Sequence, residues 1–196
     1  SAGNVVDPLE IARKYNIDSV RYYLIRETPF GEDGFFSETK LVERSNTELA
    51  NDLGNFANRV LALISQKKNS CIPKGKLDAS ITKKLDIEKI KKHFENFELH
   101  LALAEIMNFV KQCNQYINEK EPWKKDGEEL NDILYTLAEL LRAMAILLYP
   151  FIPSSSEKIA ASLGTKIECL DDIFSKKGVE GKKVESQCIL FQKIKP

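Results

Sequence analysis

Residues 44–59 read RSNTELANDLGNFANR, and this stretch decides the fold. Its apolar side chains recur at helical spacing and, at about 100° per residue, fall within one narrow stripe. A helix with such a stripe buries it against a core. The stripe continues past residue 59 and consists of Leu49, Leu53, Phe56, Val60 and Ile64.

The opposite side of this helix is unusual because it is rich in asparagine. A solvated helix face normally carries Glu, Lys and Gln, whereas Asn is a poor helix former whose amide competes for nearby backbone groups. Amide and guanidinium groups carry the donors and acceptors that can read the edge of a nucleic-acid base. A tolerated polar face is the alternative, and these residues alone favour it. The polar side carries Asn51, Asn55, Asn58 and Arg59.

Composition bounds the class of protein. The chain has 196 residues, 43% of them hydrophobic, which is enough for one substantial core with a small appended unit. No apolar run is long enough to span a bilayer, and the start of the chain lacks a basic segment followed by an apolar one. We therefore expect a cytoplasmic protein that does not bind membranes.

Cysteine and histidine residues do not indicate a metal site. The four cysteines are widely separated, and none forms a C-x-x-C pair. His93 and His100 have no Cys or carboxylate at the spacing of metal ligands and fit ordinary helix positions. We therefore expect neither a bound metal nor a histidine general base. The cysteines are Cys71, Cys113, Cys169 and Cys188.

Charge is balanced over the whole chain but not locally. The 29 basic residues oppose 29 acidic ones, so the net charge does not point to nucleic acid. Residues 66–92 hold nine lysines against three acids, a net of +6, and residues 176–196 hold six against two, a net of +4. Such patches can track a phosphate backbone, and solvated lysines at loops and helix ends explain them equally well.

The first 38 residues predict a small unit of mixed structure. Asp7-Pro8 starts a helix that ends near residue 14. Asp18 starts a second helix over residues 19–26, and residues 35–37 predict a short strand. The side chains expected to face inward from the second helix are Val20, Tyr23 and Leu24.

The rest of the chain predicts helices and an extended tail. The helix over residues 130–148 is apolar along its length, so we expect it near the centre of a bundle. Residues 187–194 predict an extended segment laid back on the body. The fold class is therefore all-α, a bundle of about five helices preceded by the small mixed α/β unit. The other helices are predicted to begin after a cap at Ser37 or Thr39 and run to 66, and to cover 80–94, 98–119 and a short stretch from Ser154 to Leu163.

Several short patterns follow one another along the chain. SAGNVVDP opens the sequence, DSVRYYL occupies 18–24 and FGEDG occupies 30–34. R-x-N-x-ELANDLGN-x-x-NR spans 44–59, N-x-YI-x-x-x-x-PW spans 114–123, and PFIP closes the apolar helix. Together they resemble the methionyl-tRNA synthetases, a class I family, over nearly the whole chain. The opening matches the residues that follow the KMSKS motif, with Ser1 as the last residue of that motif.

The resemblance implies a division of labour. Residues 1–38 would form the stem-contact segment, residues 39–175 the anticodon-binding bundle, and residues 176–196 a tail packed on the body. The HIGH motif and the nucleotide-binding fold are not in this sequence, so we expect no catalytic residue and no cofactor here. ATP and methionine would bind the catalytic domain of the same enzyme. The dimerisation module of some relatives is not in it either, so a monomer is expected.

The resemblance also implies which side chains bind tRNA. Asn55, Arg59 and Trp123 match the positions with which the family reads the CAU anticodon of tRNA(Met), especially its cytosine. Asn55 and Arg59 are four residues apart on one helix face, so both can reach the same ligand. The indole of Trp123, the only tryptophan, can stack on a splayed base of the anticodon loop. The residues expected to support them are Asn51, Asn58 and Tyr116.

Each of these side chains also has a structural explanation. Trp123 fits a partly buried anchor at the edge of a bundle. Asn55 fits a cap, and Arg59 fits a surface ion pair with Glu48 or Asp52. For the whole chain, one alternative is a non-catalytic scaffold bundle that binds proteins. Another is the anticodon domain of a cysteinyl, leucyl or isoleucyl synthetase, against which the asparagine-rich helix and the Pro-Trp pair argue.

Overall fold

A computed structural model describes residues 6–174 and 178–195, and it confirms the all-α fold class. Within those residues there is no β-strand, only one antiparallel bridge between Cys71 and Lys183. None of their helices is long and apolar enough to cross a membrane. The elements are α1 (Pro8–Lys14), α2 (Ile17–Glu27), α3 (Glu38–Arg44), η1 (Ser45–Gly54), α4 (Asn55–Lys68), α5 (Ala79–Thr82), α6 (Ile87–Glu95), α7 (Leu99–Lys120), η2 (Pro122–Lys124), α8 (Gly127–Leu148), α9 (Pro153–Ser162) and η3 (Leu170–Asp172).

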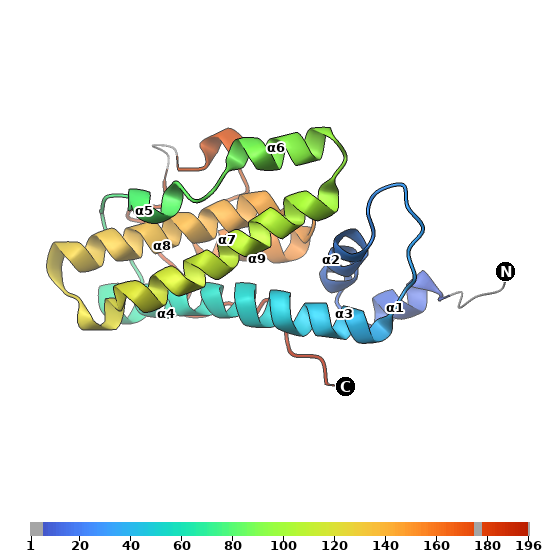
Figure 1. Ribbon diagram of the computed structural model, residues 1–196. Coiled ribbons are helices and arrows are strands. Elements are labelled where there is room, and N and C mark those ends of the chain that lie inside the picture. The colour runs from blue at the N-terminus through green and yellow to red at the C-terminus, as the bar shows by residue number, and fades with distance from the viewer. Residues whose placement is uncertain (1–5, 175–177, 196) are drawn as a thin grey trace.

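The bundle is built around α8, as its continuous apolar sequence predicts. Every side chain of α8 from Leu137 to Leu148 is buried. α4, α7 and α9 pack against α8, while α6 packs on α7 (Figure 1). Because this part of α8 is covered on all sides, most of its side chains are apolar, and its two charged ones, Glu139 and Arg142, pair with each other at 2.9 Å.

α3, η1 and α4 form one continuous helix along the edge of the bundle (Figure 1). It begins where Ser37 caps it by accepting a hydrogen bond from the N–H of Lys40, at 3.4 Å. Its middle third, η1, is a π-helix of ten residues, a winding that proteins use mostly as single turns and frequently near functional sites. The predicted apolar stripe from Leu49 to Ile64 is entirely buried.

The predicted strand at residues 35–37 is wrong. Phe35 is fully exposed, while the N–H of Ser37 donates to the Tyr23 hydroxyl at 2.7 Å. This backbone group is therefore satisfied by a side chain, and the described residues contain no strand with which it could pair. The mixed α/β unit expected before the bundle is instead two short helices and a loop.

Two predicted helix boundaries also need correction. The second helix is capped by Asn16, whose side chain accepts from the N–H of Asp18, so Asp18 lies inside the first turn. The helix predicted over residues 80–94 is two helices, because Asp86 caps a new one by accepting from the N–H of Lys89 at 2.9 Å. Of the three side chains expected to face inward from α2, Leu24 is exposed, and Tyr22 is buried in its place.

The N-terminal helices have a small core of their own, separate from that of the bundle. Its buried members come from α1, α2 and the start of the long helix. Edge-to-face packing of Tyr23 on Phe36, with ring centroids 5.5 Å apart, extends it into the loop. The core consists of Ile11, Tyr15, Val20, Tyr23 and Leu41.

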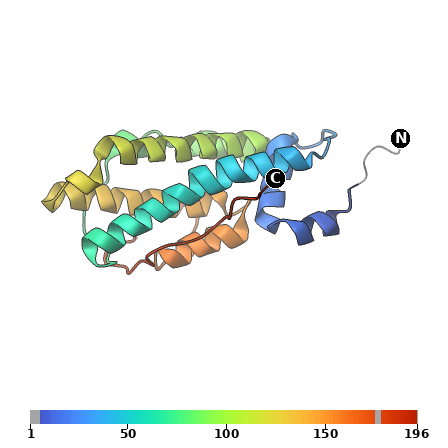
Figure 2. The ribbon, with the colours of Figure 1, turned by 90° about the horizontal axis from the view of Figure 1, so that it is seen from below.

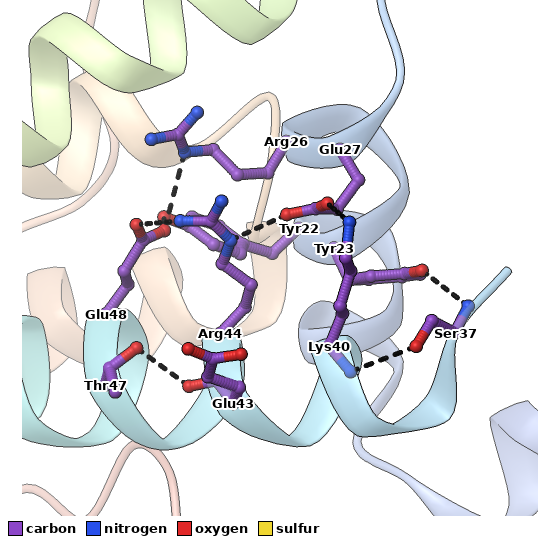
Figure 3. A network of polar contacts seen from close by, with 10 residues as sticks. All are labelled: Tyr22, Tyr23, Arg26, Glu27, Ser37, Lys40, Glu43, Arg44, Thr47 and Glu48. Carbon is purple, nitrogen blue, oxygen red and sulfur yellow. Dashed lines mark hydrogen bonds and ion pairs between the residues drawn. The ribbon is translucent and has the colours of Figure 1, made fainter. Parts of the chain in front are cut away.

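A charged network joins α2 to the long helix (Figure 3). Glu48 accepts a hydrogen bond from the Tyr22 hydroxyl, and it pairs with Arg44 at 2.7 Å and Arg26 at 3.5 Å. Arg44 also pairs with Glu27 at 2.7 Å. Burial raises the pKa of Tyr22, so its hydroxyl stays protonated and acts as a donor.

The tail packs on the body, as predicted from residues 187–194, and follows the long helix (Figure 2). Asn46 donates to the carbonyl of Ile194 at 2.9 Å and accepts from its N–H at 2.8 Å, and Asn58 accepts from the N–H of Cys188 at 3.0 Å. Six extended residues span about 20 Å, and twelve helical residues span about 18 Å. The tail therefore runs extended and antiparallel to the helix. The parts of the predicted segments at residues 1–5, 175–177 and 196 lie outside the described residues.

Candidate nucleic-acid interface

Asn55 and Arg59 lie in the first two turns of α4, where the helix leaves its π-helical section. Asn55 is exposed and Arg59 is half-buried. Arg59 donates from Nη2 to Oδ1 of Asn118 on α7, at 2.7 Å. Partial burial lowers the pKa of the Arg59 guanidinium, which still carries its charge at neutral pH. Arg59 is thus held at the surface by an amide on the neighbouring helix.

Trp123 lies in η2, directly after α7, with 45% of its surface exposed. Its backbone carbonyl accepts a hydrogen bond from Nζ of Lys67, in the last turn of α4, at 3.4 Å. α4 and α7 therefore run side by side in the same direction, with Arg59 facing Asn118 and Lys67 facing Trp123. We call these four residues the α4–α7 seam.

The seam is rimmed by further lysines. Lys124 pairs with Glu121 at 2.7 Å, and Lys125 pairs with Glu129 at 2.7 Å. Both pairs are exposed and are therefore worth little to stability. Their lysines can exchange those carboxylates for phosphate groups at small cost.

The structure does not bring the three predicted supporting residues together. Asn58 holds the tail through Cys188, and Asn51 is half-buried on the long helix. Tyr116 is buried, and its hydroxyl donates to Oδ2 of Asp78 at 3.1 Å on another side of α7. Of the wider asparagine-rich face, Arg59 thus belongs to the seam, and Asn55 lies one turn before it on α4.

Sequence reasoning gave no binding role to two residues of this region, Asn114, which opens the pattern over residues 114–123, and Asn118. Asn114 donates from Nδ2 to the carbonyl of Asp52 in η1, at 3.0 Å. The two asparagines are four residues apart on α7, the same spacing as Asn55 and Arg59 on α4. That shared spacing of polar groups on two apolar helices was the available signal.

Comparison with known protein families identifies the family of the chain that carries this surface. Residues 81–194, more than half of the chain, match the family described as the anticodon-binding domain of tRNA ligase. The chain belongs to that family. Residues 1–61 of this anticodon-binding chain also match the class I tRNA synthetases of the methionyl type.

Individual relatives of the anticodon-binding chain are of the methionyl type. Methionine–tRNA ligase of Brucella suis is 40% identical over 168 residues, which are 81% of this chain and 33% of the relative. That of Caldanaerobacter subterraneus is 37% identical over 207 residues, covering 99% of this chain and 32% of the relative. The chain therefore spans about a third of the length of these curated relatives.

A solved structure supports the same relationship. The apo form of Mycobacterium tuberculosis methionyl-tRNA synthetase superposes with a TM-score of 0.86 at 31% identity, covering 98% of this chain and 42% of that one. The resemblance to methionyl-tRNA synthetases carried by residues 18–24, 44–59 and 114–123 is thus confirmed. The predicted domain bounds and anticodon readers stay predictions.

No group of three or more His, Cys, Asp or Glu side chains in the described part of this anticodon-binding domain is placed to hold a metal ion. The carboxylate of Asp78 has a structural role, because neighbouring donors surround it. Oδ1 of Asp78 accepts from the N–H of Ser80 at 2.8 Å, and Oδ2 pairs with Lys120 at 2.8 Å as well as with Tyr116. Burial raises the pKa of Asp78, but the hydrogen bonds from Lys120, Ser80 and Tyr116 outweigh it and hold the pKa well below its usual value.

We expect Asp78→Asn to reduce the free energy of unfolding by about 1–2 kcal/mol at pH 7. Because the pKa of Asp78 is lower in the folded state, its contribution is present above about pH 3.9 and is lost as the pH falls through the folded value. Urea unfolding at pH 7 and pH 3 should show the gap between wild type and variant narrowing at the lower pH. Asp171→Asn, at an exposed ion pair with Lys91, is the control and should cost little at either pH. A gap for Asp78→Asn that is the same at both pH values would contradict this prediction.

Proposed function

We propose that this chain binds the anticodon stem-loop of tRNA(Met) and recognises its CAU anticodon at the α4–α7 seam. The single observation that carries the proposal is the arrangement of that seam. The Arg59 guanidinium is held by an amide of α7, with Asn55 one turn before it, and the backbone of Trp123, whose side chain is half-exposed, meets the last turn of α4. Membership of the anticodon-binding family supports RNA as the ligand.

The chemistry of the seam suits an unpaired pyrimidine. Amide and guanidinium groups of Asn55 and Arg59 can pair with the Watson–Crick edge of cytosine, which a single-stranded loop leaves open. The Trp123 indole offers a flat face on which a splayed base can stack. Lysines such as Lys67 supply the salt-dependent attraction for the phosphates.

A second part of the proposal concerns the activity of the complete enzyme. Its relatives are methionine–tRNA ligases about three times as long as this chain. We propose that a catalytic domain of the same enzyme binds ATP and methionine and attaches methionine to the tRNA in the cytoplasm, acting as a monomer. The residues present here supply recognition, without a cofactor or a catalytic group of their own.

Binding of two RNAs tests the function. One is an anticodon stem-loop with CAU, and the other differs only in its first anticodon base. Trp123 is the only tryptophan, so quenching of its fluorescence reports stacking directly. We expect tighter binding of the CAU stem-loop. Equal affinity for both RNAs would refute the proposal, and no binding of either would favour the scaffold alternative.

Trp123→Ala should weaken binding of the CAU stem-loop by about 1–3 kcal/mol, because it removes the stacking platform. The affinity is measured with a fluorescently labelled RNA, since the variant has no tryptophan. Phe97→Ala removes an aromatic side chain that is 64% exposed just before the start of α7, at the opposite end of that helix from Trp123, and should leave the affinity unchanged. Equal affinities of Trp123→Ala and wild type, with circular dichroism unchanged, would show that Trp123 is only an anchor.

Arg59→Ala should relax the preference for cytosine at the first anticodon position by about 1–3 kcal/mol. Lys67→Ala is the matched control, since it removes a neighbouring cation that has no expected base contact. It should weaken both RNAs alike and reduce the salt dependence of binding by about one counterion. If Arg59→Ala also weakened both RNAs equally, Arg59 would contact phosphate and not the base.

A further inference from the structure

Asn114 of α7 inserts its amide beside the end of η1. Its Nδ2 donates to two backbone carbonyls, that of Asp52 at 3.0 Å and that of Val110, one turn earlier in α7, at 3.2 Å. The Asp52 carbonyl also accepts from the N–H of Asn55, the first residue of α4. Both N–H donors of the Asn114 amide are therefore used on main-chain groups, one of them in the neighbouring helix.

The contact lies where the winding of the long helix changes. In η1 hydrogen bonds run from residue i to i+5, and in α4 they run to i+4, so the junction decides how every later side chain is directed. Displacing the junction by one residue changes that direction by an angle on the order of 100°. Asn55 and Arg59 come directly after it. A side chain that fixes the Asp52 carbonyl therefore fixes the direction of the predicted readers.

Asn118 makes a second amide contact between α7 and the long helix, this time with a side chain. It lies one turn after Asn114 on the same face of α7, and its Oδ1 accepts from Arg59 at 2.7 Å. α7 thus presents two amides, four residues apart, to the long helix. Asn114 holds the backbone at the junction, and Asn118 holds the guanidinium one turn further on.

We propose that Asn114 is a positioning residue for anticodon reading, which holds the η1–α4 junction so that Asn55 and Arg59 address the same base. This inference rests on the proposed function. Asn114 is half-buried, with its donors occupied by backbone, so it acts through the readers and does not touch RNA. Its effect is preorganisation. Without it, the side chains of Asn55 and Arg59 adopt several directions. Ordering them on binding then reduces the free energy gained from their contacts with the cognate base.

Two substitutions of Asn114 test this inference in the full chain. Asn114→Asp keeps the shape but replaces both donors with an acceptor, and Asn114→Ala removes the group. For each, the dissociation constants are measured for the CAU stem-loop and for the stem-loop with a changed first base. We expect the ratio of the two constants to fall about tenfold, or about 1.4 kcal/mol of discrimination. Gln115→Ala, at the exposed neighbouring position of α7, should leave the ratio unchanged.

The ratio separates positioning from stability, since a merely structural loss weakens both RNAs by the same factor. An unchanged ratio in folded Asn114 variants would overturn the inference, whether or not both affinities fall. Failure of both variants to fold would also overturn it, because the contact would then serve folding alone. Wild-type protein that does not distinguish the two RNAs would refute the proposed function itself, and this is seen before any variant is made.

Discussion

Arg142→Met is expected to destabilise the chain by about 3–5 kcal/mol, since it breaks a buried ion network and leaves its acids unpaired. Arg142 is 1% exposed, in the last third of α8. Its guanidinium binds Glu139 at 2.9 Å, Glu168 at 2.7 Å and the carbonyl of Asp172 at 2.7 Å. These contacts tie the segment after α9 to the centre of the bundle.

Thermal and urea unfolding measure the effect of Arg142→Met. A loss of this size lowers the melting temperature by roughly 10 °C for a chain of this length. Lys125→Met is the matched control, because it breaks an exposed pair with Glu129 and should cost about 0–1 kcal/mol. Adding Glu139→Gln to Arg142→Met should recover part of the loss. The Gln side chain removes an unpaired charge and still accepts from the N–H of Val179. A loss below about 1 kcal/mol for Arg142→Met would contradict the network's role.

Asp18→Ala is expected to cost about 3 kcal/mol, because it removes a buried carboxylate that accepts two hydrogen bonds. Oδ2 of Asp18 accepts from the N–H of Ser155 at 2.7 Å and from its hydroxyl at 2.8 Å. Ser155 lies in the first turn of α9, where the helix dipole favours a negative charge. Beside this contact, Arg21 donates to the carbonyls of Pro150 and Phe151. The N-terminal unit is therefore docked on the bundle through a helix end.

The free energy of unfolding of Asp18→Ala is compared with that of Asp7→Ala. Asp7 caps only its own short, exposed helix by accepting from the N–H of Leu9, and its loss should cost about 0.5–1 kcal/mol. Asp18→Asn keeps an acceptor without the charge and should fall between the two. Equal costs for Asp18→Ala and Asp7→Ala would show that the buried contact adds nothing.

Periodic features of the sequence carried over well into the structure. The stripe from Leu49 to Ile64 and the continuous apolar run of α8 are both buried as predicted. These predictions hold because side chains three or four residues apart lie on the same face of a helix. The spacing of apolar residues along the sequence therefore shows which face is buried. The extended tail was also predicted from a local feature, the sequence of residues 187–194.

Features that depend on contacts with one distant segment were not predicted from the sequence. Leu24 is exposed and Tyr22 is buried, because the packing and ion network of α2 select that face. Asp18 was expected to cap its own helix and instead caps α9. In the sequence, Leu24 and Tyr22 fit the buried face of the helix equally well, and Asp18 fits the start of its own helix. Only the positions of distant segments decide which side chain is buried and which helix end Asp18 contacts.

The candidate site shows the same division. The sequence by itself determined that one helix carries Asn and Arg opposite an apolar stripe, since side chains four apart share a helix face. Only the tertiary structure decided which of them meet a partner: Asn46 and Asn58 hold the tail, while Arg59 meets Asn118 across the seam. The physical reason is that helical spacing is a local property of the backbone. The partner of a polar side chain, by contrast, comes from segments up to 148 residues away, which only packing brings together.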